Sequence, residues 1–168
     1  MFSNTIPLYL INGFLEGGKT SFIQDVLTNG DFADGQKTLL ILCEEGEVEY
    51  DQSELTNLNI LSLTVDEEKD FNGEYLRNCI RKYRPKRIFV EMNGMWDCKW
   101  MFDSALPREV EITQVITIVD GSTFQVYVNN MKGILSNLFT YTEMVIFNRC
   151  TEDMPLHSFR RAVRGVNP

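Results

Sequence analysis

A glycine-rich segment near the N-terminus has the residue types and the spacing that bind the phosphates of a nucleotide. Residues 13–20 read Gly-Phe-Leu-Glu-Gly-Gly-Lys-Thr and match the pattern G-x-x-x-x-G-K-[ST]. Such a loop turns consecutive backbone N–H groups toward one point, and the helix that follows adds its positive N-terminal dipole. We expect Lys19, in an exposed position, to reach the β- and γ-phosphates, and the Thr20 hydroxyl to bind Mg²⁺. The other nucleotide-binding residues expected here are Gly13, Glu16, Gly17, Gly18 and Ser21.

A phosphate site with Mg²⁺ also needs a carboxylate, which is expected at the end of a buried strand. Glu91 ends an apolar run at 87–91, and Gly94 comes shortly after it. We expect Glu91 to hold the metal directly or through water, although a surface carboxylate at a strand end is the alternative. A backbone N–H at Gly94 would contact the γ-phosphate and so sense hydrolysis. Lys19 and Glu91 are therefore the candidate catalytic residues.

Two further acidic features follow apolar runs, and the sequence leaves their roles open. Residues 44–51 read Glu-Glu-Gly-Glu-Val-Glu-Tyr-Asp and come directly after the run at 39–43. Ligands bind at the carboxyl edge of parallel sheets, so this acidic loop is either a switch loop or an ordinary solvated loop. Asp120 ends the run at 115–119, where it either orients the metal's waters or caps the next helix.

The elements that must position these residues alternate along the chain. Continuous apolar runs predict strands buried on both faces at 8–12, 39–43, 60–64, 87–91, 114–119 and 144–148. Periodic patterns predict helices at 20–27, 71–83, 131–139 and 156–163. This order predicts an α/β fold, the three-layer P-loop NTPase domain with a mainly parallel sheet and helices on both faces. Residues 1–168 are expected to form one such domain, at the N-terminal end of a longer protein.

Composition argues against several other classes of protein. The 168 residues are 43% hydrophobic and 24% charged, as in ordinary globular domains. The net charge of −8 argues against nucleic-acid binding, and the apolar runs are too short to span a membrane. The N-terminus has no basic region typical of a signal peptide, so we expect a cytoplasmic protein. The scattered cysteines are expected to be free thiols: Cys43, Cys79, Cys98 and Cys150.

Taken together, these segments resemble the CobW/HypB/UreG family of P-loop GTPases along nearly the whole chain. The similar segments are the strand and loop at 6–20, the acidic segment at 43–51, the Walker B-like strand at 87–94, the Thr-Ile-Val-Asp strand at 117–121 and the Asn-Pro at 166–168. The resemblance implies GTP and Mg²⁺ as cofactors and a role in trafficking cobalt, nickel or zinc. It also implies a protein partner or a C-terminal domain beyond this one. A homodimer through the region of Trp96, Trp100 and Phe102 is a further implication. For these aromatic residues, packing in the core or against a partner is favoured over a cofactor-binding role.

Two departures from the family pattern bear on function. The family's Cys-x-Cys-Cys motif is missing, since residues 55–70 hold no cysteine, and thiolates bind transition metals tightly. A transition metal is therefore doubtful. Where the family has Asn-Lys-x-Asp, this chain has Asn148, Arg149, Cys150 and Thr151. A hydroxyl cannot accept both guanine hydrogen bonds, so discrimination for guanine is expected to fall by about 2–4 kcal/mol, while Arg149 can still stack on the base.

The interpretation that follows is a nucleoside triphosphatase, a phosphoanhydride hydrolase for GTP or another purine nucleotide. Slow Mg²⁺-dependent hydrolysis would switch a loop, in a metallochaperone or enzyme-activator role. The alternative is a hydrolytically inert, nucleotide-dependent binding module with relaxed base selectivity and no metal delivery. The altered base segment and the missing cysteines favour the alternative, whereas Glu91 and the complete phosphate loop favour the enzyme.

Overall fold

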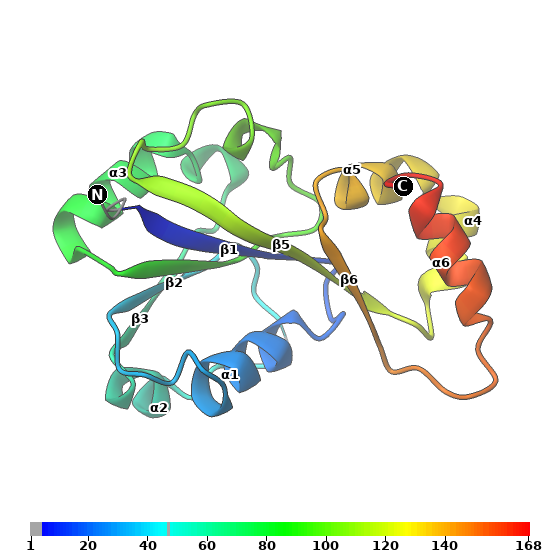
Figure 1. Cartoon of the computed structure of the whole chain (residues 1–168), viewed down its shortest axis with the longest axis horizontal. Coiled ribbons are helices and arrows are strands. Elements are labelled where there is room, and N and C mark those ends of the chain that lie inside the picture. The colour runs from blue at the N-terminus through cyan, green and yellow to red at the C-terminus, as the bar shows by residue number, and fades with distance from the viewer. Residues whose placement is uncertain (1–4, 47) are drawn as a thin grey trace.

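The computed structural model describes residues 5–46 and 48–168 and places six strands in one sheet (Figure 1). The strands are β1 (Ile6–Asn12), β2 (Thr38–Leu42), β3 (Ile60–Thr64), β4 (Arg87–Glu91), β5 (Val110–Asp120) and β6 (Met144–Asn148). Their order across the sheet is β3-β2-β4-β1-β5-β6, and every neighbouring pair is parallel. The α/β fold is confirmed. The carboxyl ends of all six strands meet at one edge, where the predicted site residues lie.

Helices cover both faces of the sheet, as expected (Figure 1). The helices are α1 (Lys19–Asn29), α2 (Gln52–Asn57), α3 (Gly73–Tyr83), α4 (Phe124–Asn130), α5 (Lys132–Phe139) and α6 (Leu156–Arg164), with 3₁₀ turns η1 (Glu68–Asp70) and η2 (Lys99–Met101). α1 and α2 lie on one face and α3 on the other, while α4, α5 and α6 gather beside β6. In the described ranges, none of these helices is long and apolar enough to cross a membrane.

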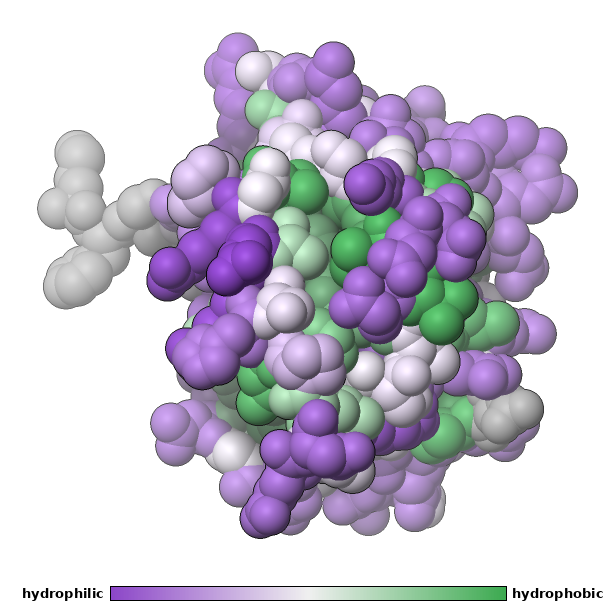
Figure 2. Space-filling view, turned by 90° about the vertical axis from the view of Figure 1, so that its right-hand side faces the viewer, coloured by the Kyte–Doolittle hydropathy of each residue, from purple (hydrophilic) through white to green (hydrophobic). Residues whose placement is uncertain are grey.

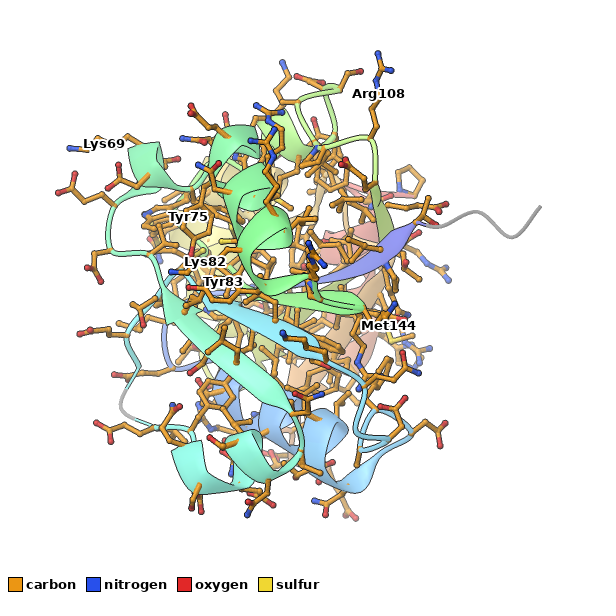
Figure 3. All side chains as sticks on the ribbon, turned by 90° about the vertical axis from the view of Figure 1, so that its left-hand side faces the viewer. Lys69, Tyr75, Lys82, Tyr83, Arg108 and Met144 are labelled. Atoms are coloured by element: carbon orange, nitrogen blue, oxygen red, sulfur yellow. The ribbon has the colours of Figure 1, made fainter. Side chains whose placement is uncertain are left out.

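The strands are apolar because both of their faces are covered. Leu8 and Leu10 of β1 pack into the cluster beneath α3, whereas Ile11 packs into the cluster beneath α1 and α2. Tyr75 and Tyr83 of α3 pack against the cluster that contains Leu8 and Leu10 (Figure 3). A third cluster joins α4, α5 and α6 to β6, and apolar side chains reach the surface in the middle of that face (Figure 2).

Several element boundaries differ from the sequence-based predictions for local reasons. α2 was not predicted; the Asp51 carboxylate caps it by accepting hydrogen bonds from the backbone N–H groups of Ser53 and Glu54. The short α4 was also not predicted. α3 begins at Gly73 rather than residue 71, because the Asn72 side chain caps it and Phe71 packs in the core. β5 begins at Val110 rather than 114, paired with β1 from that residue onward.

Candidate functional site

The phosphate-binding loop joins the end of β1 to the start of α1, at the centre of the sheet. Gly18 has a φ of 102°, and a Cβ there would lie 2.3 Å from Asn148 Nδ2. Gly94, in the segment after β4, approaches the loop so closely that a Cβ would lie 2.2 Å from the Gly13 carbonyl oxygen. Glycine is therefore required at both positions by backbone conformation or close approach. The contact also brings Gly94 to the first glycine of the loop, where a γ-phosphate sensor is expected to lie.

Lys19 is buried, which corrects the expectation of an exposed lysine. Only 3% of the residue is exposed. Its Nζ donates hydrogen bonds to the carbonyl oxygens of Gly13 at 2.6 Å and Phe14 at 3.0 Å, and it pairs with Glu44 Oε2 at 2.5 Å. The phosphate-binding loop therefore supplies two of the acceptors around Lys19, and Glu44, the first residue of the acidic loop, supplies the third.

Glu91 is likewise buried, so it is not the surface carboxylate of the alternative interpretation. The Thr20 hydroxyl donates to its Oε1 at 2.7 Å, and the Tyr50 hydroxyl donates to its Oε2 at 2.5 Å. Burial raises the pKa of Glu91 above its ordinary value, although these two hydrogen bonds and the charge of Lys19 act in the opposite direction. Burial also raises the pKa of Tyr50, which therefore stays protonated and acts as a donor.

The donor set of Thr20 and Glu91 fits Mg²⁺, which prefers oxygen ligands. The Thr20 hydroxyl donates its hydrogen to Glu91, and a hydroxyl oxygen that donates in this way coordinates a cation through its lone pairs. Lys19 lies in the same pocket as a point charge for phosphate. These residue types suit a metal and a phosphate bound side by side.

The segment after β6 is tied to the phosphate-binding loop by two side chains. Asn148 Nδ2 donates to the Gly17 carbonyl at 3.2 Å, and the Arg149 guanidinium donates to the Glu16 carbonyl at 2.7 Å. Arg149 also pairs with Asp120 Oδ2 at 2.6 Å. Asp120 therefore holds Arg149, and its other oxygen accepts hydrogen bonds from Ser122 in the turn before α4. The residue at the N-terminal cap of α4 is Thr123, which makes no side-chain cap hydrogen bond.

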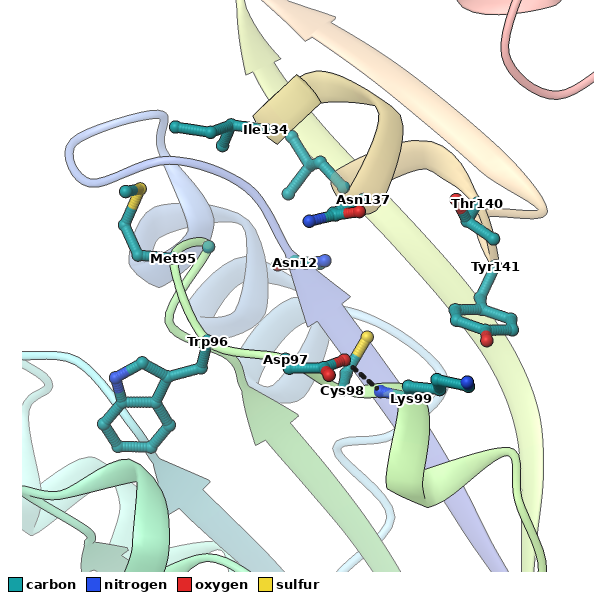
Figure 4. Close-up of a pocket in the computed structure, with 12 residues that line it drawn as sticks. Asn12, Met95, Trp96, Asp97, Cys98, Lys99, Ile134, Asn137, Thr140 and Tyr141 are labelled. Atoms are coloured by element: carbon teal, nitrogen blue, oxygen red, sulfur yellow. Dashed lines mark hydrogen bonds between the residues drawn. The ribbon is translucent and has the colours of Figure 1, made fainter. Parts of the chain in front are cut away.

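Around a cavity of about 80 Å³ the structure brings together most of the residues expected from the sequence. The expected residues in its lining are Glu16, Gly18, Lys19, Thr20, Ser21, Glu91 and Arg149, joined by Glu44 and Val48 of the acidic loop. Gly13, Gly17, Gly94, Asn148 and Thr151 are not in the lining. Gly94 instead lines a neighbouring cavity of about 270 Å³ with Asn12 and Trp96 (Figure 4). The Thr151 hydroxyl hydrogen-bonds the carboxylate of Asp153.

The family profile described as CobW/HypB/UreG, nucleotide-binding domain, matches residues 7–163. The chain belongs to this family. The CobW/HypB/UreG domain thus supplies the framework for the loop, the buried Glu91 and the segment at Asn148.

Three individual proteins similar to this CobW/HypB/UreG domain share 11–30% of their aligned residues with it. A zinc chaperone CobW from Sinorhizobium sp is 30% identical over 146 residues, which cover 70% of this chain and 37% of the relative. Among solved structures, Zn(II)-bound YjiA GTPase from E. coli aligns with a TM-score of 0.66 and 20% identity, over 95% of this chain and 54% of that one. The hydrogenase maturation factor HypB from Archaeoglobus fulgidus aligns with a TM-score of 0.66 and 11% identity, over 99% and 78%. These structural likenesses establish the fold, and this chain spans little more than a third of the curated relative.

The aromatic residues and cysteines singled out from the sequence lie outside the 80 Å³ cavity. Trp100 packs edge-on against Phe71, and Phe102 stacks on Tyr141 within the same chain, so the interpretation as core packing is confirmed for both. Residues 43, 79 and 98 are buried free cysteines and Cys150 is an exposed one. Among the described residues, no three His, Cys, Asp or Glu side chains gather as a metal site.

The contacts of Glu44 and Tyr50 were not predicted. The acidic loop stands out in the sequence as a whole, but its several carboxylates are equivalent there, and only the structure shows which one turns inward. One available signal was Tyr50, an aromatic residue in a segment otherwise made of charged and small residues. An aromatic residue is more often buried than charged neighbours are. Here Tyr50 is buried, and its hydroxyl donates a hydrogen bond to Glu91.

Proposed function

We propose that this chain binds a purine nucleoside triphosphate, in the first instance GTP, together with Mg²⁺ and hydrolyses it slowly. The observation that carries the proposal is the convergence of Lys19 with the Thr20–Glu91 hydrogen bond inside one phosphate-binding loop. Phosphoryl transfer asks the protein mainly for positioning and charge stabilisation, which these groups offer. Among the described residues we assign no side chain to the attacking water, and slow turnover is therefore expected.

Each residue would have a separate task. Lys19 and the loop amides would neutralise charge on the β- and γ-phosphates, and Mg²⁺, when bound, would supply further stabilisation of negative charge at this site. Thr20 and Glu91 would hold the metal directly or through water, while Gly94 would contact the γ-phosphate. In the full protein, hydrolysis would act as a switch toward a protein partner, a further domain or a second copy. The name of the zinc chaperone relative supports a metallochaperone or enzyme-activator role for that switch.

The test is calorimetric titration with GTP, ATP and GDP, with and without Mg²⁺, followed by measurement of phosphate release. Lys19→Ala is expected to weaken triphosphate binding at least about tenfold, because one charge-assisted contact from Lys19 to phosphate is worth about 1.5–3 kcal/mol. Lys86→Ala is the matched control, since Lys86 is exposed and precedes β4 at the opposite edge of the sheet. Equal affinity in both variants would refute the site assignment. Binding without phosphate release would support the inert binding module instead.

Stability must be measured alongside affinity for Lys19→Ala. Lys19 is buried against Glu44, so removing it leaves a carboxylate without its partner. Loss of one member of a buried pair costs up to about 3–5 kcal/mol. A lower melting temperature is therefore expected, and circular dichroism should show that the variant is folded during the titration.

A further inference from the structure

The acidic loop, residues 44–51, contacts the proposed phosphate and metal residues at both of its ends. At its start Glu44 Oε2 lies 2.5 Å from Lys19 Nζ, and both side chains are at most 9% exposed. At its end the buried Tyr50 hydroxyl donates to Glu91 Oε2. The two contacts reach the two charged groups on which the proposed function depends.

The hydrogen-bonding capacity of Lys19 is filled by these contacts. An ammonium group has three N–H donors, and Lys19 has three acceptors, the carbonyls of Gly13 and Phe14 and the Glu44 carboxylate. The two carbonyls belong to the loop that presents Lys19 and are fixed by its fold. A phosphate oxygen can therefore reach Lys19 only by replacing Glu44.

Glu91 is hydrogen-bonded at both of its oxygens. Each of its oxygens accepts a hydroxyl hydrogen, one from Thr20 and one from Tyr50. Thr20 belongs to the phosphate-binding loop, whereas Tyr50 comes from the acidic loop and would leave with it. Val48 and Glu44 also line the cavity between them. That cavity is about 80 Å³, and a second cavity of about 290 Å³ is lined by Thr20, Glu44, Tyr50 and Glu91, so Glu44 lines both.

We propose that Glu44 is an internal competitor of the nucleotide, a carboxylate that takes the contact with Lys19 required by a phosphate. Glu44 thereby lowers the affinity for nucleotide, and its displacement moves the acidic loop and withdraws Tyr50 from Glu91. This inference rests on the proposed nucleotide binding and gives the switch a physical basis. Among the glutamates of the loop that the structure describes, the role belongs to Glu44, because Glu45 and Glu49 are exposed.

The test compares Glu44→Gln with Glu45→Gln in the full chain, using Mg²⁺ with GTP, ATP and GDP. Both variants remove one negative charge from adjacent positions of one loop, but only the first removes the ionic partner of Lys19. Glu44→Gln is expected to bind nucleotide at least about tenfold more tightly, because the competing conformation no longer reduces the fraction of competent molecules. Glu45→Gln is expected to match the wild type within about twofold.

The outcomes separate this inference from the proposed function. Unchanged or weaker binding by Glu44→Gln, with wild-type binding intact, overturns the competitor role and leaves the function standing. If neither variant nor the wild type binds any nucleotide, the proposed function itself is refuted. If Glu44→Gln does not fold, Glu44→Asp provides the second test, since its shorter side chain loses the 2.5 Å contact but keeps the charge. Tighter binding by Glu44→Asp supports the role, and equal binding contradicts it.

Discussion

Glu91 ends β4 among apolar side chains of the central sheet, and only 3% of the residue is exposed. Burial raises its pKa above the value of an unfolded chain. The folded protein therefore holds this proton more tightly, so stability decreases as pH rises from the unfolded pKa, about 4.3, through the folded pKa. At neutral pH the carboxylate lowers the free energy of unfolding, a cost that a metal-binding role would justify.

Glu91→Gln is accordingly expected to melt at a higher temperature than the wild type at pH 7 and to lose this advantage below about pH 4. The amide can still bond Thr20 and Tyr50 but carries no buried charge. A change of about 1 kcal/mol moves the melting temperature of a chain this size by about 2–4 °C. Exposed Glu109→Gln is the control, with no such pH-dependent gain expected. A lower melting temperature for Glu91→Gln at pH 7 would contradict the argument, and Mg²⁺-dependent nucleotide binding should weaken in the same variant.

Single residues were predictable where the chemistry is local. The residues of the phosphate-binding loop follow from a contiguous motif whose backbone shape depends on its own glycines. The burial of Lys19 was not predicted, because it depends on Glu44, which the sequence offers among several equivalent carboxylates. The bond from Tyr50 to Glu91 joins residues 41 positions apart and depends on how β2 and β4 pair. Nothing local encodes such a contact.

At the scale of elements, strands were more predictable than short helices. The runs at 60–64, 87–91 and 144–148 match β3, β4 and β6, since burial on both faces leaves a continuous apolar signal. α2 has six residues and one buried side chain, too few for a helical period. After the buried Val110, the first half of β5 alternates exposed and half-buried residues, so only its second half, which is continuously apolar, was recognised.

The segment between β6 and α6 carries a prediction about base selectivity. Thr151 offers a hydroxyl that is bound to Asp153, while the planar Arg149 can cover either purine. We expect the preference of the wild type for GTP over ATP to stay within about tenfold, or 1.4 kcal/mol. Thr151→Asp should widen it, because a carboxylate accepts both guanine donors. Thr151→Asn, of the same shape without the charge, should widen it less.

Competitive displacement of a fluorescent nucleotide by GTP and ATP measures this preference in all three proteins. A wild-type preference of about a thousandfold for GTP would contradict the prediction. Glu152 or Asp153 would then be the displaced guanine acceptor, and Ala substitution at each would identify which. A preference that is small in the wild type and unchanged in Thr151→Asp would show instead that this segment does not read the base.

At the scale of the whole molecule, the thiols are distributed in a way that disfavours metal capture. Cys43, Cys79 and Cys98 all lie in the core cluster beneath α3, while Cys150 is exposed in the segment after β6. Burial raises the pKa of Cys43, and burial together with the neighbouring Asp97 raises that of Cys98 to about 11. Metal binding requires thiolates, so these buried thiols would have to lose protons that their surroundings stabilise.

Zinc is therefore expected to bind this chain only weakly, with a Kd above about 1 μM at pH 7, although its relatives include a zinc chaperone and a Zn(II)-bound GTPase. Competition with a fluorescent zinc indicator measures the affinity, and cobalt and nickel can be tested in the same way. Cys43→Ser should leave the result unchanged, and a thiol reagent should modify Cys150 well before the buried three in the folded protein. A stoichiometric submicromolar site lost in Cys43→Ser would overturn this view. It would mean that the core opens enough to present Cys43, next to Glu44, as a ligand at the edge of the phosphate site.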